Sequence, residues 1–200
     1  MTNADAPITT STAAGERLRI AFLVAPEGTE RVELTDPWHA VEDAGHLPEL
    51  LSTADGEVQT FDHLDRSEKF PVDAVAGKTS ASEYDALVLP GGVANPDALR
   101  LDADAVSFVR DFMDAAKPVA AICHAPWTLI EADAVRDRQL TSWPSLATDL
   151  RNAGAIWRDE RVVVDGNLVT SRKPDDLPAF VAALLEALQH GPDSARSAVT

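Results

Sequence analysis

The segment at residues 117–134, KPVAAICHAPWTLIEADA, constrains the fold of this chain more than any other. A short apolar run at 119–122 ends abruptly at Cys123, which is typical of a buried strand. Pro126 suits the first turn of a helix, because its missing N–H leaves no helical bond broken there. The segment therefore predicts a core strand, a sharp turn that contains the only cysteine of the chain, and a helix over 127–132.

The environment of Cys123 has two interpretations. A helix N-terminus presents unpaired N–H groups and a positive dipole end, and both lower the pKa of a thiol and make it reactive. An apolar buried cysteine keeps its proton and is inert. The adjacent His124 and the strand–turn–helix order favour the first interpretation, so we predict a depressed thiol pKa.

Two more apolar runs, at residues 18–25 and 84–90, have the pattern of central parallel strands. Helical spacing and helix-end signals predict helices at residues 30–45, 96–99, 103–116, 144–153 and 174–189. Pro37 is expected to bend or restart the first helix and Gly45 to end it. Alternating strands and helices predict an α/β fold with a doubly wound parallel sheet between helices.

Turn signals organise the rest of the chain. Residues 47–52 and 57–61 are predicted as two short strands around a turn at 54–56, and residues 161–171 as a hairpin. The uneven polar segment 63–82 is predicted to be an excursion loop. The expected organisation is a disordered N-terminal tail at 1–16, a single domain at 17–190 and a C-terminal tail at 191–200.

Composition excludes several function classes. Thirty-three acidic against 17 basic residues give a net charge of −16, which argues against nucleic acids and anionic membrane surfaces as partners. One cysteine forms no internal disulfide, and no metal motif or glycine-rich phosphate motif occurs, so no metal or cofactor is predicted. No apolar stretch approaches the roughly 20 residues of a membrane helix, and the N-terminus lacks a secretory signal. We therefore expect a cytoplasmic protein.

Several motifs occur in an order that resembles a known family. They read YDALVLPGG at 84–92, KPVAAICH-x-P at 117–126, TSWPS at 141–145, DLRNAGA at 149–155 and VVVDGNLVTSR at 162–172. Together they resemble the PfpI-type intracellular proteases of the ThiJ/PfpI superfamily, over residues 18–188. The resemblance implies a flavodoxin-like α/β sandwich related to class I glutamine amidotransferase domains.

The resemblance also implies residue roles. The family's nucleophile matches Cys123, and its neighbouring histidine matches His124. Its third member, an acid donated by an adjacent subunit, matches Asp97, where the family's proteases have the longer Glu; a helix-cap or first-turn acid is the competing interpretation. A second acid that hydrogen-bonds the cysteine matches Glu33, with Glu30 as the competing candidate. A carboxylic acid buried beside the sulfur would have a raised pKa and donate its proton, whereas a solvated first-turn acid would not.

The glycines at 91 and 92 match the family's loop that faces the cysteine. Glycine lets the backbone approach closely and aim N–H groups at a developing oxyanion, and the N–H of His124 is a second donor. Ala125 stands where the family often has glycine, which narrows the backbone options without removing a reacting group. Arg172 is expected either to anchor a loop near the site or to be a surface arginine. No chemistry is assigned to the other histidines, which are His39, His46, His63 and His190.

These residues predict a cysteine-dependent hydrolase of the PfpI type, in which the thiolate attacks a peptide or amide carbonyl and His124 is the acid/base. Attack on an aldehyde such as methylglyoxal would give glyoxalase or deglycase chemistry with the same nucleophile. A redox sensor with a reactive thiol and a chaperone-like stress protein are the non-enzymatic alternatives. Besides a small aldehyde or peptide substrate, we expect a homodimer or higher homo-oligomer in which Asp97 reaches His124 of another subunit.

Overall fold

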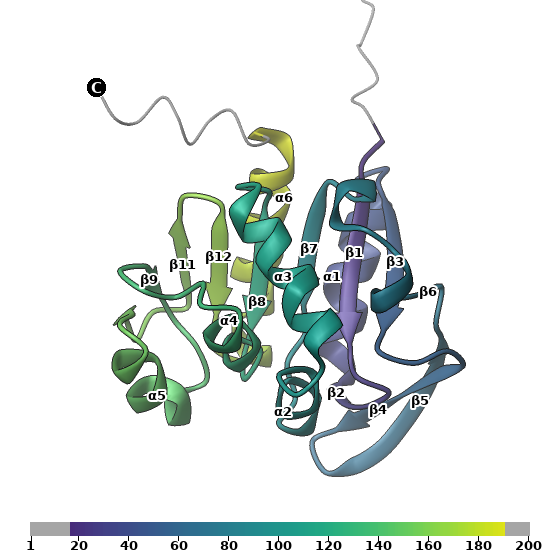
Figure 1. Cartoon of the computed structure of the whole chain (residues 1–200), viewed down its shortest axis with the longest axis horizontal. Coiled ribbons are helices and arrows are strands. Elements are labelled where there is room, and N and C mark those ends of the chain that lie inside the picture. Colours follow the sequence, from purple (N-terminus) through teal and green to yellow (C-terminus); the bar gives the residue numbers. More distant parts are fainter. Residues whose placement is uncertain (1–16, 191–200) are drawn as a thin grey trace, which may run out of the picture.

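A seven-stranded sheet forms the centre of the computed structural model, which describes residues 17–190 (Figure 1). The strand order is β11-β12-β8-β7-β1-β3-β6, and every neighbouring pair is parallel except β11 and β12. The strands are β1 (Arg19–Val24), β3 (Leu47–Ser52), β6 (Ala74–Val75), β7 (Ala86–Leu89), β8 (Val119–Ile122), β11 (Val162–Asp165) and β12 (Leu168–Ser171). The predicted α/β fold with a mostly parallel sheet is confirmed. The predicted tails at 1–16 and 191–200 lie outside the described residues.

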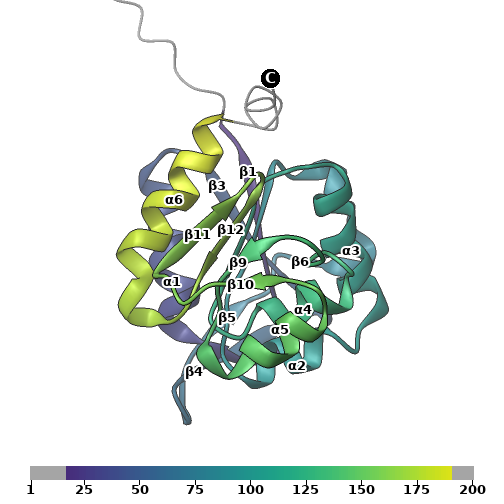
Figure 2. The ribbon, with the colours of Figure 1, turned by 90° about the vertical axis from the view of Figure 1, so that its left-hand side faces the viewer.

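Helices cover both faces of the sheet (Figure 2). One layer contains α1 (Arg31–Asp43) and α6 (Leu177–His190), and the other contains α2 (Ala94–Leu99), α3 (Ala103–Asp114), α4 (Pro126–Glu131) and α5 (Ala147–Asn152). The packing of strand β1 explains why its residues are apolar at successive positions. Ile20, Phe22 and Val24 pack toward α1 and α6, while Ala21 and Leu23 pack toward the other layer. A central strand that is buried on both faces needs apolar residues at successive positions.

The first helix departs from the prediction at Pro37, because α1 continues through this residue without restarting. Proline removes one helical hydrogen bond, but packing of the buried Leu34 and Val41 holds the helix on both sides of it. Gly45 follows the helix with a φ of 87°, as predicted for the residue that ends it. The helices predicted at 144–153 and 174–189 both begin with a 3-10 turn, Pro144–Leu146 and Pro174–Asp176.

A second, three-stranded sheet was not predicted. It has the order β2-β4-β5 and contains β2 (Glu27–Glu30), β4 (Glu57–Asp62) and β5 (Asp65–Pro71). We call the antiparallel pair β4–β5, residues 57–71, the hairpin arm. The strands predicted at 47–52 and 57–61 exist, but they belong to different sheets: β3 pairs with β1 and β6, and β4 with β2 and β5.

The predicted excursion loop at 63–82 is wrong, since it contains β5, β6 and two 3-10 turns, Ala76–Lys78 and Ala81–Glu83. The exposed and charged β5 lacks the alternating pattern of a half-buried strand, so only its pairing with β4 reveals it. A short parallel pair, β9 (Gln139–Leu140) and β10 (Ile156–Trp157), was also missed. Within residues 17–190, no helix has the length and apolar character needed to cross a membrane.

Candidate active site

The loops after β1, β7 and β8 meet at one edge of the sheet, because parallel strands end on the same side. A cavity of about 350 Å³ lies there. Its lining combines four of the predicted site residues, Glu33, Gly92, Cys123 and His124, with residues near the tip of the hairpin arm. The lining residues are Gly28, Glu30, Glu33, Phe61, His63, Leu64, Gly92, Val93, Ala94, Cys123, His124, Trp143 and Pro174.

Cys123 occupies the predicted turn between β8 and α4, with a φ of 64°. This left-handed conformation is unfavourable for a residue with a side chain, so neighbouring hydrogen bonds must hold it. The Cys123 N–H donates to the carbonyl oxygen of Ser171 at 3.0 Å, and its own carbonyl accepts from the Trp143 N–H at 2.8 Å. The turn thereby directs the buried sulfur-bearing side chain into the cavity.

Glu33 lies beside the cysteine in the first turn of α1 and is fully buried. Its Oε2 accepts a hydrogen bond from the Gly91 N–H at 3.0 Å. Oε1 has no hydrogen-bonding partner among the described residues, although the carboxyl is near enough to the thiol for each group to shift the pKa of the other. Burial raises the pKa of Glu33 to about 8, so this carboxyl is protonated at neutral pH.

The thiol pKa expected from the sequence is wrong in direction. Burial and the nearby Glu33 carboxyl raise the pKa of Cys123, whereas the backbone N–H groups of Gly92 and His124 lower it only in part. The helix that was expected to lower it, α4, has six residues, so its dipole is small. A protonated Glu33 removes the charge repulsion and offers the sulfur a hydrogen-bond donor.

His124 is 7% exposed, and its ring contacts two indole rings. Its ring stacks on Trp143 at a centroid distance of 5.8 Å and lies 5.2 Å from the ring of Trp127. Its Nδ1 is buried without a hydrogen-bonding partner within residues 17–190. Burial lowers the pKa of His124, so the ring is neutral near pH 7 and able to accept a proton.

Close packing and backbone conformation require glycine at positions 91 and 92, in the loop after β7. A Cβ on Gly91 would lie 2.6 Å from the Cβ of Cys123, and Gly92 has a φ of 84°. The Gly91 N–H is donated to Glu33, and the N–H groups of Gly92 and His124 lie close enough to the sulfur to lower the pKa of the thiol.

Asn95 was missed by the sequence analysis, although it holds this loop. The buried Asn95 amide donates to the carbonyl oxygens of Pro90 at 2.8 Å and Gly91 at 3.0 Å. Its Oδ1 accepts from the Ala25 N–H at 2.7 Å, so one side chain ties the end of β1 to the end of β7. The available signal was an asparagine three residues after Gly92 and two before Asp97.

The two remaining acid candidates lie in different places. Asp97 is exposed in the first turn of α2, does not line the cavity, and makes no hydrogen bond or ion pair among residues 17–190. The structure therefore does not bring Asp97 to His124 within one chain, and contact across subunits stays a prediction. Glu30 does line the cavity, but its Oε2 accepts from the His63 N–H at 3.0 Å.

The hairpin arm and the loops that contain Trp143 and Pro174 complete the walls of the cavity. Phe61, His63 and Leu64 come from the arm; Phe61 ends the strand predicted at 57–61, whereas His63 and Leu64 lie in the segment predicted to be a loop. Arg172 forms ion pairs with Asp176 and Asp159, at 2.8 and 2.7 Å, which supports the loop-anchoring interpretation. Among residues 17–190, no group of three His, Cys, Asp or Glu side chains is arranged to hold a metal ion.

The DJ-1/PfpI family model matches residues 18–187. The chain belongs to the DJ-1/PfpI family. A deglycase of Pyrococcus horikoshii is 42% identical over 86% of this chain and 100% of its own length. YraA of Bacillus subtilis, named for an inferred cysteine protease activity, is 40% identical over 86% of this chain and 98% of its own. A crystal structure of a two-domain protein from Anabaena variabilis, with DJ-1/ThiJ/PfpI-like and ferritin-like domains, has a TM-score of 0.80 and 36% identity, covering 86% of this chain and 50% of that one.

The first two relatives are named as a deglycase and as a cysteine protease, and a third, from Bacillus subtilis, is named general stress protein 18. Both enzyme names agree with an enzyme that uses a cysteine nucleophile.

Proposed function

We propose that this protein is a cysteine-dependent enzyme of the glyoxalase and deglycase type, which converts small α-oxoaldehydes and their amine adducts. The observation that carries the proposal is the position of the buried Cys123 in the lining of a small, partly open cavity of about 350 Å³. A carbonyl compound of a few carbon atoms fits such a space, whereas an extended peptide needs a groove along several residues.

The first step forms a bond between the Cys123 sulfur and the aldehyde carbon. The thiol proton passes to a nearby base, for which the neutral His124 ring is suited. The carbonyl oxygen takes up the negative charge, and the N–H groups of Gly92 and His124 are the donors beside the sulfur. The product of this step is a hemithioacetal.

Moving the aldehyde hydrogen to the neighbouring carbonyl carbon, as a proton through an enediol, turns the hemithioacetal into a thioester. Water then cleaves the thioester to a 2-hydroxy acid and the free thiol. The whole reaction consumes one water and is redox-neutral. A protonated Glu33 stabilises the thiolate before each attack and needs no charge of its own. Removal of reactive aldehydes would give the protein a role in carbonyl stress.

The test is to incubate the purified protein with methylglyoxal and to measure methylglyoxal loss and lactate formation. A fluorogenic peptide is assayed in parallel, and Cys123→Ala is the control in both assays. Lactate formation that depends on Cys123 supports the proposal. Cysteine-dependent peptide cleavage without lactate formation would replace it with the protease function.

The unpartnered Nδ1 of His124 favours a peptidase as the second candidate. Amide hydrolysis must protonate an amine leaving group, so it needs a histidine that an acid orients. The predicted source of this acid is Asp97 of a neighbouring subunit in a homo-oligomer, since Asp97 of the same chain does not line the cavity.

Mixing Cys123→Ala chains with Asp97→Ala chains after reversible dissociation tests this candidate. Half of all dimers would be mixed and each mixed dimer would contain one complete site out of two, so about a quarter of the wild-type peptidase activity should return. Demonstrably mixed dimers without recovery, from two inactive parents, would exclude Asp97 as the shared acid.

A further inference from the structure

We propose that the cavity selects carbonyl compounds that are uncharged or positively charged and rejects anionic ones, and that Glu30 determines this selectivity. The proposal deepens the function proposed above, because it defines the substrate class of the same cavity. It separates neutral α-oxoaldehydes, and adducts on basic side chains, from aldehydes that carry a carboxylate or a phosphate.

The lining of the cavity has an unbalanced charge. Two glutamates face it, and none of its 13 lining residues is lysine or arginine. Glu33 is protonated at neutral pH because burial raises its pKa to about 8, so Glu30 is the carboxylate that contributes a negative charge. The buried and unpartnered polar atoms of the lining are Glu33 Oε1 and His124 Nδ1, and neither carries a positive charge in these states.

Glu30 is held in place at the cavity wall. It is the last residue of β2 and directly precedes α1, and its side chain is 12% exposed. The His63 N–H donates to Oε2 at 3.0 Å, which fixes the carboxylate against the tip of the hairpin arm. A charge that is largely removed from water acts more strongly on a neighbouring charge than one at the surface.

The field of Glu30 reaches the reacting groups, since its charge contributes to the raised pKa of Glu33. The positive charge that could offset Glu30, on the His63 ring, has a weak effect. The His63 ring lies 3.9 Å from Glu30, but it is 89% exposed and screened by water when protonated. The N–H groups near the sulfur are suited to the one oxyanion that the reaction creates, and a second anionic group would meet Glu30 without a cation.

The chain as a whole is negatively charged, like Glu30. Its net charge of −16 repels anionic reagents at long range, and salt screens this repulsion. The contribution of Glu30 must therefore be separated from the effect of overall charge, and the chain offers a matched variant. Glu27 lies on the same strand, outside the cavity lining, with a 63% exposed side chain. Glu27→Gln and Glu30→Gln change the net charge equally.

The experiment compares iodoacetamide and iodoacetate, two alkylating reagents of similar size that differ in charge. The chain has one cysteine, so intact mass reports alkylation of Cys123 alone. The ratio of the two rates, divided by the same ratio for glutathione, gives the selectivity of the cavity. Any change in the thiol pKa affects both reagents equally and cancels in this ratio.

We expect the wild-type ratio to favour iodoacetamide about tenfold more than glutathione does. Glu30→Gln should remove most of that preference, because the amide oxygen still accepts from His63 while the charge is lost. Glu27→Gln should keep it. A wild-type ratio equal to that of glutathione, or an equal fall in both variants, would overturn the proposal. Circular dichroism confirms that each variant is folded.

Alkylation needs a reactive thiol but no turnover, so its outcome is independent of the proposed enzyme activity. A second comparison then uses methylglyoxal and hydroxypyruvaldehyde phosphate, a neutral and an anionic α-oxoaldehyde that both have a ketone next to the aldehyde. Charge selectivity in alkylation without methylglyoxal turnover would sink the proposed function and leave this inference standing. Turnover of both aldehydes at equal efficiency would overturn the inference and leave the function standing.

Discussion

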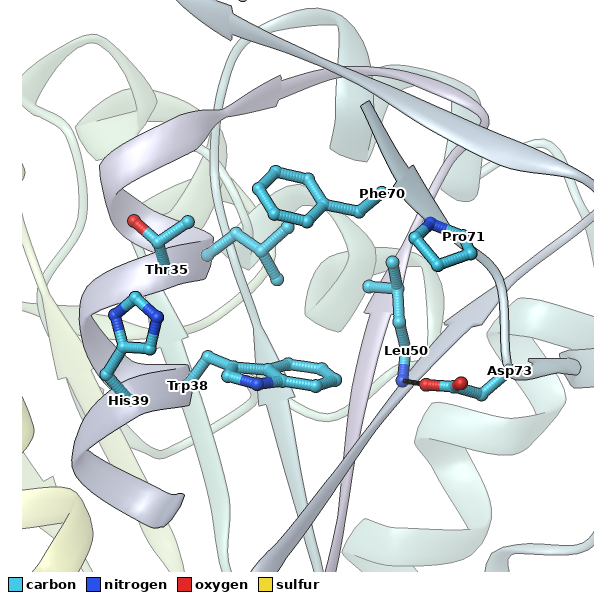
Figure 3. A pocket seen from close by; sticks show the side chains of 8 residues that line it. Thr35, Trp38, His39, Leu50, Phe70, Pro71 and Asp73 are labelled. Carbon is cyan, nitrogen blue, oxygen red and sulfur yellow. Dashed lines mark hydrogen bonds between the residues drawn. The ribbon is translucent and has the colours of Figure 1, made fainter. Parts of the chain in front are cut away.

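Two cavities in this molecule are both bordered by α1 and the hairpin arm but differ in how their polar atoms are paired. The cavity that Cys123 lines, which we call the catalytic cavity after the function proposed above, and a smaller one of about 200 Å³ are both lined by α1 and the hairpin arm. The smaller one, which we call the apolar cavity, is lined by Leu34, Thr35, Trp38, His39, Leu50, Phe70, Pro71 and Asp73 (Figure 3). In Figure 3, Trp38 from α1 and Phe70 from the arm border the same space.

The difference lies in how each cavity treats its polar atoms. The Asp73 carboxylate accepts from the Leu50 N–H at 2.8 Å, a bond drawn in Figure 3. The catalytic cavity instead leaves buried polar atoms of Glu33 and His124 without partners and holds Cys123 at a left-handed φ. Unpaired buried groups and strained backbone lower stability, so they persist where a function requires them. The cavity around Cys123 is distinguished from the apolar cavity by its unpartnered polar atoms together with the strained backbone of Cys123.

The largest expected effect is on enzyme activity. It should appear when the catalytic cavity is mutated and not when the apolar cavity is mutated. Cys123→Ala should lower methylglyoxal turnover by at least about 10³-fold, because the bond-forming atom is removed. Phe70→Leu changes a wall of the apolar cavity and should leave turnover unchanged within the error of the assay. Initial rates of lactate formation at matched concentrations of folded protein provide the comparison. A comparable loss in Phe70→Leu would show that the apolar cavity takes part in catalysis.

The sequence predicted the catalytic turn well because its signals are local. The apolar run before Cys123 and Pro126 after it specify strand, turn and helix within a few residues. The buried strands at 19–24 and 86–89 were recognisable for the same reason. The proximity of Glu33 to the sulfur came from the family resemblance, since the two residues are 90 positions apart.

What the sequence did not predict depends on contacts between distant segments. The arm strand β5 is charged and exposed, and it becomes a strand only by pairing with β4, which in turn pairs with β2. Because that sheet was not predicted, the sequence did not place Phe61 and His63 in the wall of the cavity. The direction of the thiol pKa was missed for a related reason, because burial beside Glu33 is a tertiary property and outweighs a short helix dipole.

The next effect concerns stability as a function of pH. The pKa of Glu33 is raised to about 8 from an ordinary value of 4.5, so the folded state binds a proton that the unfolded state has lost. The resulting stabilisation is complete below pH 4.5 and disappears as the pH rises through about 8. We expect the unfolding free energy to fall by a few kcal/mol from pH 5 to pH 9, relative to Glu33→Gln.

Urea unfolding at several pH values measures this difference. Phe70→Leu is the comparison from the apolar cavity, where the loss of packing should be the same at each pH. A Glu33→Gln variant with the same pH dependence as the wild type would place the titrating group elsewhere.

A smaller effect is expected in the alkylation rate of Cys123. Glu33 and Cys123 titrate as a pair, so the fraction of molecules with a thiolate beside a protonated Glu33 stops rising once the pair has lost its first proton. The iodoacetamide rate should therefore level off above pH 8, near the pKa of Glu33. In Glu33→Gln, the rate should rise about tenfold between pH 8 and pH 9, as for an isolated thiol of higher pKa.

Glu30→Gln is the control for this profile and should keep the plateau, because Glu33 remains the partner of the sulfur. A plateau that disappears in Glu30→Gln and remains in Glu33→Gln would identify Glu30 as the acid coupled to the thiol. Glu33→Leu, which has no donor, should be slower to alkylate than Glu33→Gln at every pH.

The smallest effect tests whether the apolar cavity is an unfilled part of the core. Thr35 lines it from α1, and a methionine there would extend hydrocarbon into the space between Trp38 and Phe70. Thr35→Met should stabilise the fold by about 1 kcal/mol, whereas Phe70→Leu should destabilise it by a similar amount. Methionine also forms helices better than threonine does, so the gain needs a control. Thr35→Gln has nearly the same helix propensity with a polar end. If Thr35→Met and Thr35→Gln are equally stable in urea unfolding, filling the cavity contributes nothing, and the space is kept open by solvent.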